Sequence, residues 1–149
     1  MFKKSSLAIA AVLLASSASS FAATATGNFN VSATLTPVCS VSADAISLTY
    51  TSLQTTDSIN TGALTVKCTA GQTYSLSVSN PSSKLAALDL NYTVGIVGAS
   101  SGTAVTTGTG TGSNETDKVV KVTIGANQGG SVTGATYTAS ATHTVTVTY

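Results

Sequence analysis

The chain has 149 residues, of which only 7% are charged, and its six basic and five acidic side chains give a net charge of +1. Its length allows one domain with a modest core. The chain contains no arginine, and beyond positions 3 and 4 its lysines form no dense cluster. Because nucleic-acid binding needs a basic stripe that neutralises phosphates, nucleic acid is excluded as a partner.

The first 22 residues are predicted to be a secretory signal peptide. Two lysines at positions 3 and 4 precede an apolar run over 7–14, which is too short to span a bilayer. Small residues flank Phe21 in the cleavage-site pattern of 20–22, so we place the mature start at Ala23, with cleavage after 23–25 as a second candidate. We therefore expect an exported protein.

Residues 27–35 show the alternation of a strand with one buried face. The apolar side chains stand at odd positions and Asn, Ser or Thr at even ones, with Phe29, Val31, Ala33 and Leu35 as the apolar set. Gly27 continues this register and suggests a close approach of backbone to another surface. A strand beside the mature N-terminus is a candidate to complete the sheet of another molecule. The alternative is the first strand of the chain's own sheet.

The two cysteines, Cys39 and Cys68, are predicted to form a disulfide. An even pair in an exported chain is typical of such a bond. A metal pair or a reactive thiol has no support, since the spacing fits no zinc site and the only histidine, His143, is far away in sequence.

The remainder of the chain reads as short strands separated by turns. Alternating apolar residues occur over 64–68, 74–78, 88–96, 120–124 and 145–149, and turn residues occupy 60–62, 80–82 and 125–130. This spacing predicts an all-β, antiparallel β-sandwich. The tract 99–113 is almost wholly Gly, Ser, Thr and Ala and is predicted to be a mobile surface loop or a long hairpin connection.

No catalytic set is visible in the sequence. There is no Gly-x-Ser-x-Gly elbow and no phosphate loop, and His143 is expected to be a packed or edge residue. Glu115 and Asp117 are spaced like a glycosidase pair or a calcium site, but a solvated turn before a strand is the favoured interpretation. We therefore predict no enzyme activity, no cofactor, no metal and no small-molecule substrate.

Three threonines at 144, 146 and 148 resemble one row of a flat ice-binding face. Such a face needs several copies of the row. The sequence shows one strand, so we interpret these threonines as the exposed side of that strand.

Three segments together resemble the spore coat protein U domain family, which includes subunits of archaic chaperone–usher pili. They are the pre-cysteine strand over 27–39, the segment 64–78 with its Cys68-Thr-Ala-Gly-Gln-Thr-Tyr74 motif, and the alternating end over 143–149. The resemblance implies an immunoglobulin-like β-sandwich that lacks its last strand. Residues 23–36 would be a donor-strand extension and residues 37–149 the pilin-type domain.

The resemblance also implies a mechanism. A periplasmic chaperone lends a strand to the incomplete sandwich, and at the outer-membrane usher the extension of the next subunit replaces it. Carried over by position, the donor anchors would be Gly27, Phe29, Val31, Ala33 and Leu35, and the acceptor groove would be lined by Val41, Val145, Val147 and Tyr149.

The expected function is that of a structural subunit in a homopolymeric surface pilus that supports adhesion and biofilm formation. The alternative is a self-contained, secreted coat or binding protein that acts as a monomer.

Overall fold

The computed structural model describes residues 23–131 and 137–149, so the predicted signal peptide lies outside the described residues. The chain divides into a unit that ends at Thr34 and a unit of Leu35–Tyr149. Within the described residues there is no helix of the length and apolar character needed to cross a membrane.

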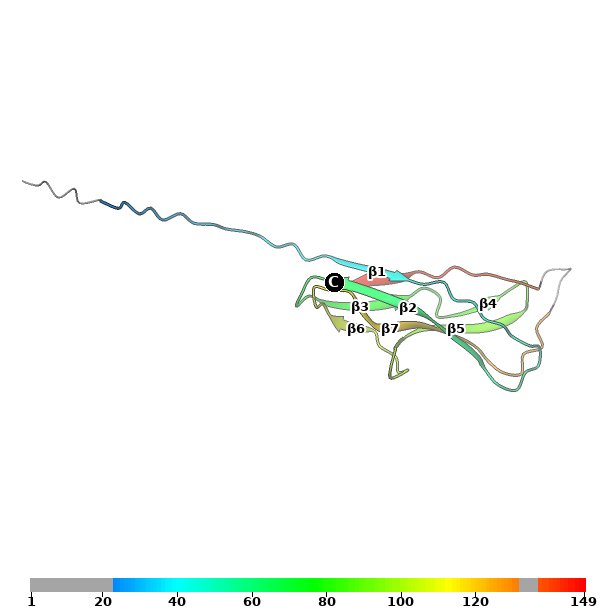
Figure 1. Ribbon diagram of the computed structural model, residues 1–149. Coiled ribbons are helices and arrows are strands. Elements are labelled where there is room, and N and C mark those ends of the chain that lie inside the picture. The colour runs from blue at the N-terminus through cyan, green and yellow to red at the C-terminus, as the bar shows by residue number, and fades with distance from the viewer. Residues whose placement is uncertain (1–22, 132–136) are drawn as a thin grey trace, which may run out of the picture. The chain divides into compact units, whose positions relative to one another are not determined.

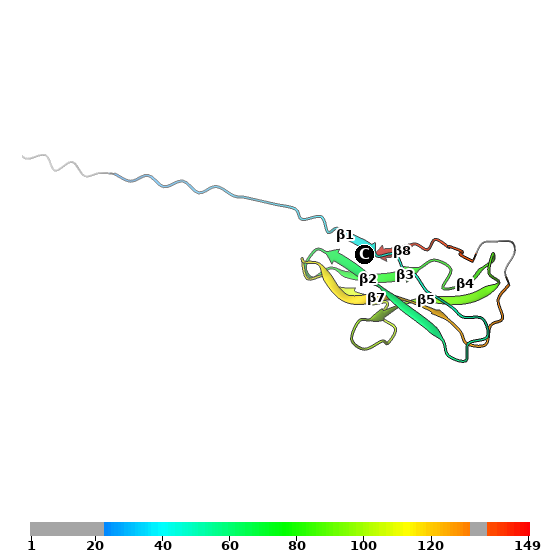
Figure 2. The same ribbon diagram turned by 45° about the vertical axis from the view of Figure 1, so that its right-hand side comes forward.

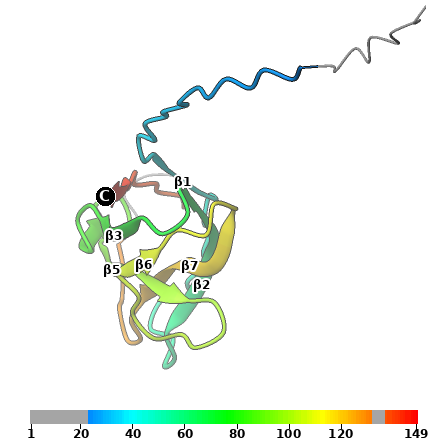
Figure 3. The ribbon, with the colours of Figure 1, turned by 90° about the vertical axis from the view of Figure 1, so that its left-hand side faces the viewer.

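The second unit consists of two antiparallel sheets, and the end-on view in Figure 3 shows them as two layers. One sheet has five strands in the order β1-β2-β7-β5-β4, and the other has three in the order β6-β3-β8. Figure 1 labels the strands that can be followed in that view. Their bounds are β1 Cys39–Ala43, β2 Ser58–Cys68, β3 Thr73–Val78, β4 Ser82–Leu85, β5 Leu90–Gly98, β6 Thr107–Thr109, β7 Glu115–Ile124 and β8 Val145–Thr148.

The core lies between the two sheets and follows the alternation in the sequence. Every second residue of the main strands points inward, because successive side chains of a strand alternate between its faces. The buried apolar cluster comprises Leu64, Val66, Cys68, Tyr74, Leu76, Tyr92, Val94, Ile96, Val120 and Ile124. The all-β, two-sheet architecture predicted from the sequence is confirmed.

The Gly/Thr tract over 99–113 packs against the rest of the sandwich. It contains β6, which pairs with β3, and its residue Gly110 exchanges backbone hydrogen bonds with the turn after β2. A Cβ at Gly108 or Gly110 would lie closer than 3.0 Å to Tyr74 or Cys68, respectively. The tract joins the antiparallel neighbours β5 and β7, so it is the long hairpin connection that was one of the two alternatives predicted from the sequence, and its glycines permit close packing.

The N-terminal unit contains no strand among its described residues, 23–34. Its side chains are exposed, with 85% of Phe29 and 80% of Val31 accessible. The segment 27–35, whose alternation predicts a strand, therefore has no strand partner in the single chain.

Candidate functional site

Strand β1 is an edge strand with one open side. It pairs only with β2 among the described strands, and Asp44 N–H donates to Ala63 O while Thr69 N–H donates to Val38 O, both at 3.0 Å. In an antiparallel ladder, the residues that bond to the neighbour alternate with residues that bond to the other side. The N–H and C=O groups of Cys39 and Val41 therefore point away from β2.

Strand β8 is an edge strand of the other sheet and has the same property. It pairs only with β3 among the described strands, and Ser79 N–H donates to Thr144 O at 2.9 Å. By the same alternation, the backbone N–H and C=O groups of the even-numbered residues of β8 bond to β3. Those of Val145 and Val147 point away from β3.

The two open edges lie beside each other. Figures 1 and 2 show β8, in red, next to β1, in cyan, and residues of the two strands are neighbours in space. The side chains of Cys39, Val41, Val145 and Val147 pack against the core but are only half-buried. The same residues thus direct apolar side chains inward and unpaired backbone groups outward. This combination is a template for one further strand.

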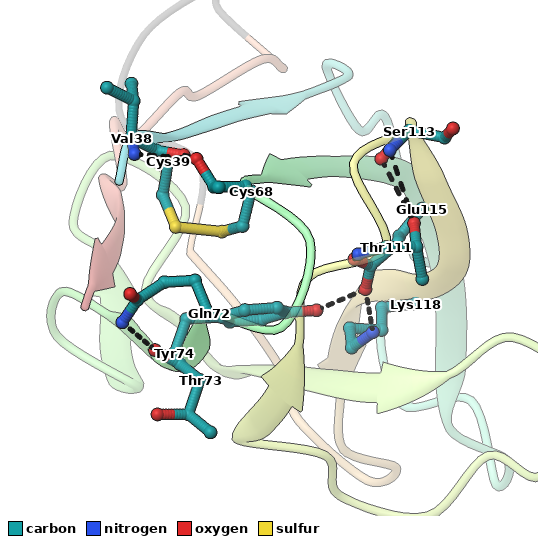
Figure 4. The surroundings of a disulfide bond; sticks show 11 residues. Val38, Cys39, Cys68, Gln72, Thr73, Tyr74, Thr111, Ser113, Glu115 and Lys118 are labelled. Atoms are coloured by element: carbon teal, nitrogen blue, oxygen red, sulfur yellow. Dashed lines mark hydrogen bonds and ion pairs between the residues drawn. A yellow bond between two sulfur atoms is a disulfide. The ribbon is translucent and has the colours of Figure 1, made fainter. Parts of the chain in front are cut away.

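The predicted disulfide is present and fixes one of these edges. Cys39 and Cys68 face each other in the β1–β2 ladder, with a Cα–Cα distance of 4.1 Å and an S–S bond of 2.03 Å, as shown in Figure 4. Cys68 is buried in the core, whereas Cys39 belongs to the open strand. The bond therefore ties the edge strand covalently to the interior.

Residues 25–89 match the Spore Coat Protein U domain family. The match includes the exposed N-terminal segment, β1, both cysteines and strands β2 to β4. Residues 143–149, which contribute to the sequence resemblance, lie beyond it. No curated protein and no solved structure was found to match the chain.

Three of the four predicted acceptor residues come together at the open edges. Val41 on β1 and Val145 and Val147 on β8 point toward the core at the neighbouring edges. Tyr149 does not join them as a covered residue: it follows the end of β8 and its side chain is 55% exposed.

His143 connects the two sheets at the start of β8. Its Nδ1 lies 2.8 Å from Ser79 O, and its Nε2 lies 2.7 Å from the hydroxyl of Tyr92. Because a carbonyl can only accept, Nδ1–H donates to Ser79 and Nε2 accepts from Tyr92. The histidine is a packed residue, as predicted, and it holds the start of the open strand against β5.

A buried lysine near the disulfide was not anticipated from the sequence. Lys118 is 4% exposed and lies on the inward face of β7, in phase with Val120. Its Nζ donates to Asp117 Oδ1 at 2.8 Å and to Glu115 Oε2 at 3.4 Å, and it lies 5.6 Å from the centre of the Tyr74 ring. A lysine in the inward phase of an alternating strand was the available signal.

Glu115 is the centre of this cluster, as Figure 4 shows. Its carboxylate accepts from the Tyr74 hydroxyl at 2.5 Å and from Thr111 N–H at 3.1 Å, in addition to Lys118. The prediction of a solvated turn was therefore wrong for Glu115, whose side chain is 11% exposed. Asp117 is solvated, with 72% of its side chain exposed, but it lies within β7 and not in a turn before the strand. Glu115 fastens the Gly/Thr tract to β3 and β7.

The protonation states of Lys118 and Tyr74 in this cluster are fixed near pH 7. Burial lowers the pKa of Lys118, but the hydrogen bonds to Asp117 and Tyr74 outweigh burial and raise this pKa well above its usual range. Burial and the hydrogen bond to Glu115 raise the pKa of Tyr74. Lysine stays charged and tyrosine neutral near pH 7. In the described part of the chain, no group of three or more His, Cys, Asp or Glu residues could hold a metal ion.

Proposed function

We propose that the protein is a structural subunit of a fibre in which residues 27–35 of one copy add as a strand at the neighbouring open edges of β1 and β8 of the next. The observation that carries this proposal is the pair of neighbouring open edges with half-buried side chains. An alternating segment without a strand partner exists in the same chain. Such pairing would be strand addition, in which backbone bonds give affinity and alternate side chains give register.

The dimensions and chemistry of the segment suit this role. Nine extended residues span about 30 Å, enough to cover either short edge strand. Phe29, Val31 and Leu35 are 78–85% exposed and share one face, with Ala33 between them and Gly27 at the start of the same row. Burying the three large side chains would contribute roughly 5–9 kcal/mol before the cost of ordering the segment.

The chain's own segment is poorly placed to pair with its own open edges as a hairpin. Val38 is already held in the β1–β2 ladder, since its N–H donates to Thr69 Oγ1 and its C=O accepts from Thr69 N–H, both at 3.0 Å. Only Thr36 and Pro37 remain to reverse the chain after Leu35. Proline restricts its own φ and disfavours helical geometry in the residue before it. A second copy has no such restraint.

The family supplies the wider setting of the proposal. Spore coat protein U domains include subunits of chaperone–usher pili, so the proposed partners are a periplasmic chaperone, an outer-membrane usher and further copies of this chain. The proposed location is a cell-surface pilus reached through the periplasm, with adhesion and biofilm support as its role. The proposed domains correspond to these two roles. Residues 23–36 would be the donor extension and residues 37–149 the sandwich that accepts a donor strand.

The decisive comparison uses two neighbouring positions of the donor segment. Val31→Asp places a charge among the anchors and is expected to abolish polymers, whereas Ser32→Asp places the same charge on the opposite face and should leave them intact. Polymers are measured by size-exclusion chromatography and electron microscopy of the exported full chain.

A second measurement removes residues 23–36 and returns them as a peptide. The proposal expects the truncated domain to be unstable alone and to be stabilised by the peptide. A stable monomer that ignores the peptide would refute the proposal and favour the secreted, self-contained protein.

A further inference from the structure

The outer face of the three-stranded sheet is covered by hydroxyl groups. Cross-strand partners share a face, and the register places Thr107, Ser75 and Thr148 in one row across all three strands. Adjacent rows pair Thr109 with Thr73 and Ser77 with Thr146. All seven side chains are exposed, while Tyr74, Leu76 and Val147 between them point inward. The single threonine row seen in the sequence is thus part of a face three strands wide.

This hydroxyl face has no charged side chain. Only 7% of the chain is charged, and none of the charged residues that the structure describes lies on this face. Among the described residues, the lysines and the acidic side chains lie instead on the five-stranded sheet and in loops. Such a face neither attracts nor repels an anionic or a cationic partner. Electrostatic complementarity therefore favours a neutral partner.

A shallow hollow of about 570 Å³ lies on this face. Five residues of the hydroxyl face line it, together with Gln72, Tyr74, Gly108 and Tyr149; the five are Thr73, Ser75, Thr107, Thr109 and Thr148. Gln72 adds an amide that can both donate and accept, and Tyr149 adds an aromatic ring that is 55% exposed.

The geometry points to a site for a neutral saccharide, and we propose that one or two sugar rings of an uncharged polysaccharide bind in this hollow. Hydroxyls that both donate and accept match the hydroxyls of a sugar, and they recur roughly every 5 Å across the strands and 7 Å along them. The exposed face of Tyr149 offers an apolar platform for the C–H face of a sugar ring.

The neighbouring hollow on the other side of β6 has different chemistry. It measures about 650 Å³ and is lined by Glu115, Asp117 and Lys118 as well as by hydroxyl residues. Its charges are already engaged with one another in the buried cluster. A neutral sugar would therefore favour the first hollow. This inference does not depend on fibre assembly, although a fibre would repeat the site and raise its avidity.

The test is an NMR titration of the purified full chain with neutral hexasaccharides of glucose, mannose and N-acetylglucosamine, and with a sulfated hexasaccharide as the charged comparison. We expect saturable shifts confined to β3, β6 and β8 for at least one neutral sugar. Tyr149→Ala and, independently, Ser75→Lys should weaken this binding at least tenfold.

Two variants provide matched controls: Ser77→Ala changes a hydroxyl on the same face outside the hollow, and Thr93→Lys adds a lysine to an exposed position of β5. Both should bind as the unaltered chain does. The proposal is overturned if no neutral sugar gives saturable shifts up to millimolar concentration, if all variants bind equally, or if the sulfated sugar is preferred. Thermal hysteresis without sugar binding would overturn it in favour of an ice-binding face.

Discussion

Replacing Lys118 tests whether the buried cluster stabilises the sandwich through its charge. The lysine side chain is 5% exposed and is held by Asp117 and Glu115. Removing one partner of a buried ion pair costs about 3–5 kcal/mol. Asp117 is mostly exposed and would be rehydrated, and Glu115 would keep its bonds from Tyr74 and Thr111, so we expect Lys118→Ala to cost about 2–3 kcal/mol.

Two further variants separate the charge from the packing of the lysine stem. Lys118→Met retains a stem of similar shape and isolates the loss of charge, for which we expect about 1.5–3 kcal/mol. Adding Glu115→Gln to it removes the carboxylate left without its cation and should restore at least half of that loss. Asp117→Asn is the control and should cost less than about 1 kcal/mol, because an exposed ion pair contributes little.

The assay is urea unfolding followed by far-UV circular dichroism, with every variant compared in the same assembly state. The reasoning fails if Lys118→Met is as stable as the unaltered chain. It also fails if the double variant is less stable than Lys118→Met, or if Asp117→Asn costs as much as Lys118→Ala.

Three other perturbations have defined outcomes. Gly110→Ala places a Cβ closer than 3.0 Å to Cys68 and should cost about 1–3 kcal/mol by urea unfolding, whereas Gly95→Ala, with nothing within 4 Å of its Cβ, should cost less than about 1 kcal/mol. Cys68→Ser opens a loop with a sequence separation of 29 and should cost about 3–4 kcal/mol; an unchanged unfolding midpoint would show the bond to be dispensable. Because the pKa values of Tyr74 and Lys118 are raised in the folded chain, their contribution is complete below about pH 10 and declines above it, so unfolding free energies measured from pH 7 to 11 should fall at the alkaline end and should fall less in Tyr74→Phe.

Strands with a buried face were predictable because apolar and polar residues alternate along their sequences. Residues 64–68, 74–78 and 120–124 carry large apolar side chains at every second position, and each lies in a strand of the structure. Strand β6 could not be found in this way, since its inward residue is a glycine. Strand β4 is four residues long and follows Pro81, which indicated a turn. Small or short elements leave no periodic signal.

The candidate site was predictable only in part, for a related reason. The inward direction of Val41, Val145 and Val147 follows from periodicity, but the side to which their N–H and C=O groups point depends on which neighbour each strand pairs with. Lys118 was missed because a charged residue in a strand usually marks its exposed face. Only the structure shows that Glu115 and Asp117 turn toward it.

The opposite directions of β1 and β8, visible from their arrowheads in Figures 1 and 2, limit how the proposed donor strand could pair with both edges. Any strand that pairs with both edges must run antiparallel to one and parallel to the other. Its hydrogen bonds would be perpendicular and unevenly spaced on the first side, and slanted and evenly spaced on the second. A strand inserted backwards would exchange these two patterns. The mixed pairing would therefore give the proposed donor strand a single direction, which apolar side chains alone do not impose.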